Sequence, residues 1–87
     1  MSKAVKKANN TNPFSYYILC NGKYYYVDAR DVGNSEFELM VFNSEYDENS
    51  DSFETNWNPE VYCMRYHTKD EMILDFVEVA LNLENYV

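Results

Sequence analysis

Residues 16–27, YYILCNGKYYYV, predict a β-hairpin around which the rest of the fold is arranged. Two runs of β-favouring residues flank Asn21-Gly22, the pair that best suits a type I′ turn because both central residues need positive φ. A two-residue loop sets the register, so that Cys20 opposes Lys23 and Tyr16 opposes Val27. One face then carries Tyr16, Ile18, Cys20, Lys23, Tyr25 and Val27, and the other carries Tyr17, Leu19, Tyr24 and Tyr26. Neither face is clearly a solvent face, so either both are partly covered or one is a Tyr-rich binding surface.

The segments that follow the hairpin predict two more strands. Residues 28–35 contain Asp, Gly and Asn and are predicted to form a turn. Residues 36–42 alternate and predict a third strand, with a core face made of Phe37, Leu39 and Val41. Residues 43–58 are acidic and rich in Asn and Ser, and are predicted to form a loop. Residues 60–67 alternate again and predict a fourth strand.

A helix is predicted after the fourth strand. Thr68 and Glu71 match the N-cap and N3 positions of a capping box, and acidic residues suit the positive end of the helix dipole. Apolar residues at helical spacing extend the helix to about Leu83. Those expected to face the sheet are Met72, Ile73, Phe76, Val77, Ala80 and Leu83, and those expected to face water are Asp75, Glu78, Asn82 and Asn85.

These elements predict an α+β fold in which one C-terminal helix packs on a largely antiparallel four-stranded sheet. Residues 1–12 are polar and basic, and are predicted to be a flexible tail that ends near Pro13. Residues 13–87 are predicted to form a single domain, because 87 residues suffice for one core and not for two.

Acidic residues dominate the charge. Fifteen Asp and Glu residues against seven Lys and Arg residues give a net charge of −8. Lys3, Lys6 and Lys7 lie in the first seven residues, so residues 8–87 carry four bases against fifteen acids, or −11. A field of this sign repels nucleic acid and anionic lipid and attracts basic surfaces. We therefore expect no direct nucleic-acid partner and no membrane partner.

The sequence also predicts a cytoplasmic location. No segment approaches the roughly 18 apolar residues of a membrane span. The Lys- and Asn-rich start has no apolar core of a secretory signal. Cys20 and Cys63 are then expected to be reduced thiols.

A calcium motif is present only in part. Asp47-x-Asn49-x-Asp51 copies the first three ligand positions of an EF-hand loop. Ser52 replaces the Gly that the sixth position requires, and Asn58 replaces the bidentate Glu of the twelfth. The sequence therefore favours a solvated acidic loop over a calcium site.

Zinc binding and catalysis are also poorly supported. Cys20, Cys63 and His67 offer three ligands, whereas a closed zinc site takes four. A reactive Cys63–His67 pair would need a lowered thiol pKa and an oxyanion hole, and no Gly-rich turn marks one. Acid pairs such as Glu36 and Glu38 suggest glycosidase chemistry, but a chain this short rarely builds the cleft. We expect no enzymatic activity, no cofactor and no metal.

The strongest functional signal is a set of carboxylates interleaved with aromatic residues. Aromatic anchors within charge are typical of tight protein interfaces, and charge of opposite sign speeds capture of a basic partner. The candidate partner-binding residues are Glu36, Glu38, Glu45, Tyr46, Asp47, Glu48, Asp51, Phe53, Glu54 and Trp57.

In its small size, its acidity, its abundant Tyr, Asn and Asp and its basic N-terminal segment, the chain resembles inhibitors encoded by phages and mobile elements. Anti-CRISPR proteins and anti-restriction DNA mimics have this character. The resemblance covers the whole chain and rests on composition, so it assigns no residue roles. It implies a stoichiometric inhibitor in the host cytoplasm whose acidic face occupies the nucleic-acid-binding surface of a basic CRISPR-associated or restriction nuclease. We expect the chain to be a monomer or a homodimer.

Two other interpretations stay open. The chain could be an immunity or antitoxin-like protein, or a regulator, that binds through its Tyr-rich sheet, because an exposed strand edge can pair with another chain. The acidic surface could also serve only to keep the protein soluble.

Overall fold

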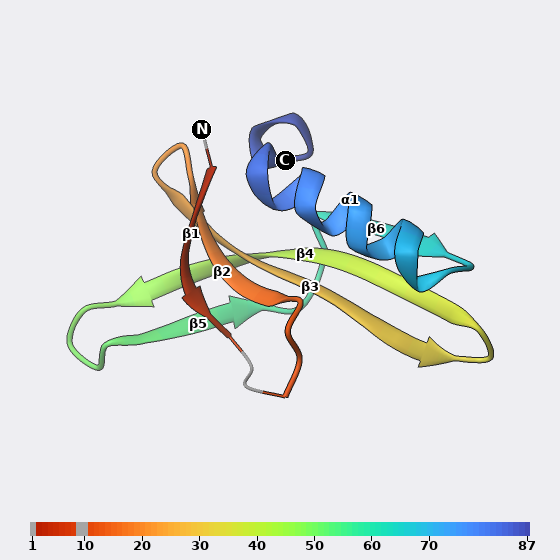
Figure 1. Cartoon of the computed structure of the whole chain (residues 1–87). Coiled ribbons are helices and arrows are strands. Elements are labelled where there is room, and N and C mark those ends of the chain that lie inside the picture. Colours follow the sequence, from red (N-terminus) through yellow and green to blue (C-terminus); the bar gives the residue numbers. More distant parts are fainter. Residues whose placement is uncertain (1, 9–10) are drawn as a thin grey trace.

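One antiparallel sheet and one α-helix make up residues 2–8 and 11–87, the part of the chain that the computed structural model describes (Figure 1). The strands in this part are β1 (Ser2–Lys7), β2 (Ser15–Cys20), β3 (Lys23–Gly33), β4 (Glu36–Asp47), β5 (Ser52–Asn56) and β6 (Tyr62–Tyr66). The helices are α1 (Lys69–Leu81) and the short 3₁₀ helix η1 (Leu83–Asn85). The α+β class is as predicted, but the described sheet has six strands and not four.

The β2–β3 hairpin has the register that the sequence predicts. Cys20 pairs with Lys23, and Tyr16 pairs with Val27. Asn21 and Gly22 have φ values of 51° and 80°, so both central residues of the turn adopt the left-handed conformation that type I′ requires. Local turn chemistry is therefore enough to build this part of the sheet.

The strand order is β1-β2-β3-β4, and two strands share the far edge of β4. β6 pairs with Phe37–Val41, and β5 pairs with Asn43–Asp47. β4 has twelve residues, which is long enough to hold both neighbours. β6 lies beside α1, whereas β5 lies toward the other end of β4 (Figure 1).

The main core lies between α1 and one face of the sheet. The sheet contributes aliphatic side chains that are fully buried, and α1 and η1 cover them. The largest fully buried apolar side chains are Ile18, Val27, Leu39, Val41, Met72, Val79 and Leu83. Burying one such side chain stabilises a fold by about 1.5–3 kcal/mol, so this layer is the principal source of stability.

The helix begins at its predicted cap. The backbone N–H of Glu71 donates a hydrogen bond to Oγ1 of Thr68 at 3.2 Å. The Thr68 hydroxyl in turn donates to the Glu71 carboxylate at 2.9 Å. In a capping box the N3 carboxylate accepts from the backbone N–H of the N-cap residue, so here the same two residues close a variant of that motif.

The rotation of α1 differs from prediction at one position. Val77, predicted to face the sheet, is exposed, and Val79 is buried in its place. Either residue fits the helical spacing, so only the position of the sheet decides which one points inward. The remaining predicted core residues are buried or half-buried: Met72, Ile73, Phe76, Ala80 and Leu83.

The polar side of α1 is only partly as predicted. Glu78 and Asn85 are exposed, whereas Asp75 and Asn82 are half-buried. The Tyr66 hydroxyl donates a hydrogen bond to Asp75 at 2.7 Å. This carboxylate therefore ties α1 to β6 and does not simply face water.

The predicted flexible tail is wrong for residues 2–7, which form β1, while residues 1 and 9–10 lie outside the described part. β1 pairs with the edge of β2 through its backbone, and its side chains are exposed except that of Ser2. A strand held by backbone hydrogen bonds leaves no hydrophobic pattern in the sequence. The Ser2 hydroxyl donates to the carbonyl of Ala80 at 2.8 Å and accepts from the N–H of Leu83 at 3.2 Å.

Two predicted loops are shorter than expected. The turn predicted over residues 28–35 is confined to Asn34 and Ser35, which have φ values of 55° and 59°, because β3 continues to Gly33. The loop predicted over residues 43–58 contains the end of β4 and the whole of β5. The end of β4 and the whole of β5 extend past α1, so neither of their faces is buried under the helix. Acidic and polar residues are therefore tolerated on both faces, and the sequence shows no clear alternation there.

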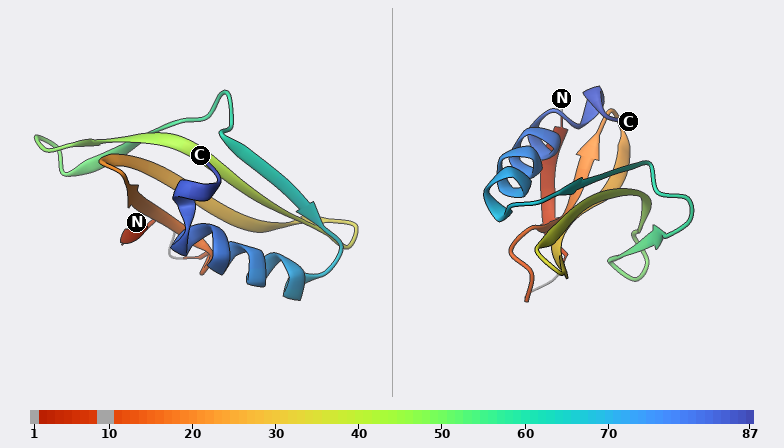
Figure 2. Two further views of the ribbon diagram at one scale, coloured as in Figure 1. Left: turned by 90° about the horizontal axis from the view of Figure 1, so that it is seen from above. Right: turned by 90° about the vertical axis from the view of Figure 1, so that its right-hand side faces the viewer.

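The sheet curls away from the helix at its β5 side. Figure 2 shows α1 on one face of the sheet and β5 bent round toward the other face. The molecule measures 41 × 25 × 22 Å, so the β4–β5 hairpin is part of an elongated shape. None of the described helices has the length and apolar character needed to cross a membrane.

Candidate protein-binding surface

The β4–β5 hairpin carries the candidate surface, and we call its residues 45–54 the acidic hairpin. Its five carboxylates are exposed: Glu45, Asp47, Glu48, Asp51 and Glu54. Within the described residues, none of the five forms an ion pair with a cation. The hairpin therefore gathers five uncompensated negative charges at one end of the molecule.

Two of these carboxylates face each other across the hairpin. Glu45 and Glu54 are direct partners in the β4–β5 register. Like charges directly opposite each other destabilise an antiparallel pair. They line a shallow groove together with Asn43, Ser44, Thr55 and Asn56. A cationic side chain placed in this groove would relieve the repulsion.

The turn of the hairpin is organised by Asp47. Its carboxylate accepts hydrogen bonds from the N–H of Asn49 and the hydroxyl of Ser50, each at 3.0 Å. Asp51 has a φ of 50°, which places it in the left-handed region that Asp tolerates. Part of the EF-hand-like sequence therefore serves as the turn between two strands.

Tyr46 links the turn to the aromatic side of the hairpin. Its hydroxyl donates to the Asp51 carboxylate at 2.5 Å. This hydrogen bond, with the nearby acidic charge, raises the pKa of the Tyr46 phenol above its ordinary value. Tyr46 is therefore a neutral hydrogen-bond donor at physiological pH.

Seven aromatic rings pack together on the sheet face opposite α1, and we call them the aromatic cluster. Phe53 stacks on Tyr17 with ring centroids 4.2 Å apart, and also contacts Tyr24 and Tyr46 at 5.3 and 5.0 Å. The full cluster is Tyr17, Tyr24, Tyr26, Phe42, Tyr46, Phe53 and Trp57. The curl of the sheet brings these rings from four strands and the β5–β6 connection into one layer.

The aromatic cluster is buried at its centre and open at its rim. Tyr26 and Phe42 are buried, whereas Trp57 is 59% and Tyr46 is 37% exposed. Trp57 packs edge-on against Tyr26 and Phe42, with centroids 5.3 and 5.0 Å away. An exposed ring held by buried rings is a preorganised contact for a partner side chain.

The structure separates two of the candidate residues from the others. Glu36 and Glu38 lie at the start of β4, roughly 30 Å of strand from the turn of the acidic hairpin. Arg65 lies within 3.4 Å of Glu36 and 3.1 Å of Glu38, so a cation already faces both carboxylates. The remaining candidates lie together on or beside the acidic hairpin: Glu45, Tyr46, Asp47, Glu48, Asp51, Phe53, Glu54 and Trp57.

The candidate residues predicted from the sequence do not include four members of the aromatic cluster: Tyr17, Tyr24, Tyr26 and Phe42. The sequence does place Tyr17, Tyr24 and Tyr26 on one face of the hairpin, as an alternative Tyr-rich surface. The signal was the alternation that puts aromatic residues on the second face of both the β2–β3 hairpin and β4. Alternation tells which side chains share a face of a strand. It does not predict the curl of the sheet that brings a side chain of β5 into contact with one of β2.

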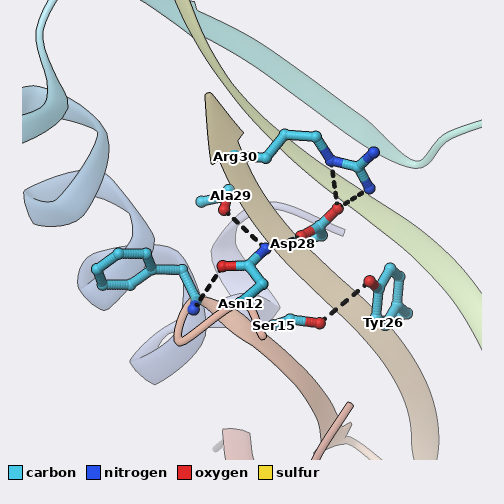
Figure 3. A network of polar contacts seen from close by, with 7 residues as sticks. Asn12, Ser15, Tyr26, Asp28, Ala29 and Arg30 are labelled. Atoms are coloured by element: carbon cyan, nitrogen blue, oxygen red, sulfur yellow. Dashed lines mark hydrogen bonds and ion pairs between the residues drawn. The ribbon is translucent and has the colours of Figure 1, made fainter. Parts of the chain in front are cut away.

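A polar network anchors the middle of β3 (Figure 3). Asp28 is buried and accepts hydrogen bonds from Nδ2 of Asn12 and Nε of Arg30, each at 2.8 Å, and Nη2 of Arg30 also donates to it. The amide of Asn12 additionally donates to the carbonyl of Ala29 and accepts from the N–H of Phe14. Since its oxygens are occupied, this carboxylate has a structural role that holds residues 12–14 against β3.

The cysteines do not form a site together. Cys20 lies in the core under α1, and Cys63 is exposed on β6. Burial and the nearby carboxylates Glu38 and Glu60 raise the pKa of the Cys63 thiol, which is opposite to what a nucleophile needs. Across the described residues, no three His, Cys, Asp or Glu side chains are grouped for a metal.

Comparisons of this chain with protein-family models, with curated proteins and with solved structures found no match.

Proposed function

We propose that this chain is a protein-binding inhibitor whose acidic hairpin occupies the nucleic-acid-binding surface of a basic protein, such as a CRISPR-associated or restriction nuclease. The observation that carries the proposal is the group of five exposed carboxylates without a cation partner among the described residues. Elsewhere in the fold, Arg30 and Arg65 face carboxylates of the sheet. The hairpin carboxylates are therefore available to a partner, and they are the five exposed acids that lie closest together in the chain.

The geometry supports binding in two ways. Lys and Arg side chains that normally neutralise phosphates can pair with the hairpin carboxylates, and Glu45 and Glu54 offer two carboxylate groups across one groove. Arg can also stack on the exposed rings of Tyr46 and Trp57. Carboxylates give the attraction and the rate of association, while aromatic rings give an anchor that excludes water. Glu45 and Glu54 point to the opposite face of the hairpin from Tyr46 and Phe53, so a partner that uses both kinds of contact must reach round the hairpin.

Fewer structural features support the alternative function, an immunity, antitoxin-like or regulatory protein that binds its partner through the Tyr-rich sheet. β1 already pairs with the edge of β2. Tyr25 and Tyr26 are buried, and Tyr17 is stacked on Phe53. Most of the Tyr-rich hairpin is thus engaged within the chain, and the acidic hairpin is the more accessible surface.

The test is inhibition of DNA cleavage and binding to a panel of purified CRISPR-associated and restriction nucleases, at 50 and 300 mM salt. The matched variants are Glu45→Gln with Glu54→Gln in the hairpin, and Glu60→Gln with Asp70→Asn outside it. Both remove two charges. We expect about a tenfold or greater loss of affinity for the hairpin variant and little change for the other, since hydrogen bonds to charged groups carry about 1.5–3 kcal/mol.

The hairpin variant relieves a like-charge pair, so a loss of binding cannot be ascribed to unfolding. We also expect affinity to fall as salt rises. Equal loss in the two variants would show that only net charge matters, and binding that is insensitive to both would exclude the acidic hairpin as the contact surface.

A further inference from the structure

A second surface lies on α1, on the side that faces away from the sheet. Leu74, Val77 and Leu81 are 72%, 48% and 63% exposed. They recur at i, i+3 and i+7 and therefore form one line along the helix, which we call the outer stripe. Figure 2 shows that α1 is an outer layer of the fold, with the sheet on one side of it.

The fold itself does not need the outer stripe. The inward side of α1 is already filled by Met72, Phe76 and Val79, which are buried in the core. Single exposed apolar residues are common on protein surfaces, whereas these three form a continuous apolar line that a partner could cover. Val is also a weaker helix former than Lys, Glu or Gln, so Val77 is not explained by helix stability.

The charges beside the outer stripe indicate what covers it. In a heptad that places Leu74 and Leu81 at a and Val77 at d, Glu71 and Glu78 both occupy e. These flanking positions are exposed. α1 has one base, Lys69, at its first residue and none in its last turn. The outer stripe is thus an apolar seam with an acidic flank.

We propose that the outer stripe docks an amphipathic helix of a basic partner. Apolar side chains of that helix would pack at a and d against Leu74, Val77 and Leu81. Its Lys or Arg side chains would lie opposite Glu71 and Glu78, as flanking charges do in paired helices.

A second copy of this chain fits the outer stripe less well. Antiparallel pairing of two α1 helices would place Glu71 and Glu78 of one copy beside the same acids of the other. Each copy also carries a net charge of −8. α1 has 13 residues, or about 20 Å, which is too short a seam to offset that repulsion.

The helix is well held for docking. Thr68 caps its first turn, and Tyr66 is hydrogen-bonded to Asp75. Ser2 of β1 binds the carbonyl of Ala80 and the N–H of Leu83 at its C-terminal end. A partner therefore meets a preformed surface and does not have to order it.

The experiment uses the full chain and a fluorescein-labelled 18-residue peptide with Leu at a and d and Lys at e and g. A control peptide has Ser in place of each Leu and the same charge. Fluorescence polarisation gives the affinities, and ¹H–¹⁵N spectra of the protein locate the contact. The protein variants are Leu74→Gln with Leu81→Gln, Glu78→Lys, and Glu60→Gln as a control outside both surfaces.

In the ¹H–¹⁵N spectra we expect chemical-shift changes confined to α1 when the Leu peptide is added. The affinity for that peptide should fall at least tenfold in the double Leu variant and should also fall in Glu78→Lys. The Glu60→Gln control should keep its affinity within about twofold, and the Ser peptide should bind at least tenfold less well. Substitution of exposed residues leaves the fold intact, and circular dichroism verifies this. Three results would overturn the proposal: equal binding of the Ser peptide, chemical-shift changes confined to the acidic hairpin, or a dimer in sedimentation equilibrium that the double Leu variant dissociates.

Discussion

The ring of Tyr17 on β2 stacks on the ring of Phe53 on β5, with centroids 4.2 Å apart and planes 10° from parallel. β3 and β4 lie between these strands in the sheet. In a flat sheet, strands three places apart are separated by roughly 14 Å. The contact therefore shows how strongly the sheet curls, and it makes Phe53 one of the residues, with Tyr46, that hold the acidic hairpin against the rest of the fold.

Replacing Phe53 with Ala is expected to lower the free energy of unfolding by about 1–3 kcal/mol. The side chain is half-buried and touches Tyr17, Tyr24 and Tyr46, so the loss should be smaller than for a fully buried ring. Urea titration followed by circular dichroism measures the change. Phe53→Leu, which keeps apolar volume without stacking, should lose less. A change below about 0.5 kcal/mol for Phe53→Ala would mean that the curl does not depend on this ring.

Ser2 is expected to contribute more to stability than any exposed residue of β1. Ser2→Ala removes a donor to the carbonyl of Ala80 and an acceptor for the N–H of Leu83, and leaves both backbone groups without that partner. The expected cost is about 1–3 kcal/mol. Lys3→Ala on the exposed side of the same strand should be nearly neutral. Equal unfolding free energies for the two variants would contradict the role of Ser2 in joining β1 to the helical segment.

The hydroxyl of Tyr66 makes stability depend on pH in the alkaline range. Burial, and then the hydrogen bond to Asp75, raise the pKa of Tyr66 far above its ordinary value of about 10. The folded state therefore keeps a proton that the unfolded state releases above that value. This contribution is fully present below pH 10 and decreases as pH rises above it toward the folded-state pKa.

The comparison that isolates this effect is the wild-type protein against Tyr66→Phe in urea at pH 8, 10 and 11.5. Below pH 10 the wild-type protein should be the more stable by about 1–3 kcal/mol, because Asp75 loses its donor in the variant. The advantage should shrink at pH 11.5. A difference between the two proteins that stays constant with pH would show that Tyr66 ionises equally in the folded and unfolded states.

Glu54→Lys is expected to stabilise the fold while weakening partner binding. The introduced lysine would stand opposite Glu45, so a like-charge pair becomes an attractive one. Cross-strand pairs of this kind change stability by about 0.2–1 kcal/mol. Thermal unfolding measures the gain, with Thr55→Lys as a control at the next position. A lower melting temperature for Glu54→Lys would show that the two carboxylates do not repel each other in the folded protein.

Much of the candidate site follows from the sequence, because charge is a property of composition. The five hairpin carboxylates and Tyr46, Phe53 and Trp57 are close in the chain, and the hairpin keeps them close in space. Glu36 and Glu38 are on the same strand but at its other end, where Arg65 of β6 faces them. The ion pairs between Arg65 and these two acids join residues far apart in the sequence, so no local pattern predicts them.

Elements whose stability is local could be predicted from the residues alone. The Asn21-Gly22 turn specifies its own hairpin register, and Thr68 caps its own helix, since both depend on neighbours within a few residues. Tertiary structure decided the rest: β1 and β5 are strands because long edges were available to pair with them, and Val79 faces inward, not Val77, because of where the sheet lies. Such choices depend on backbone hydrogen bonds and packing between distant segments, and these leave no periodic trace in the residues themselves.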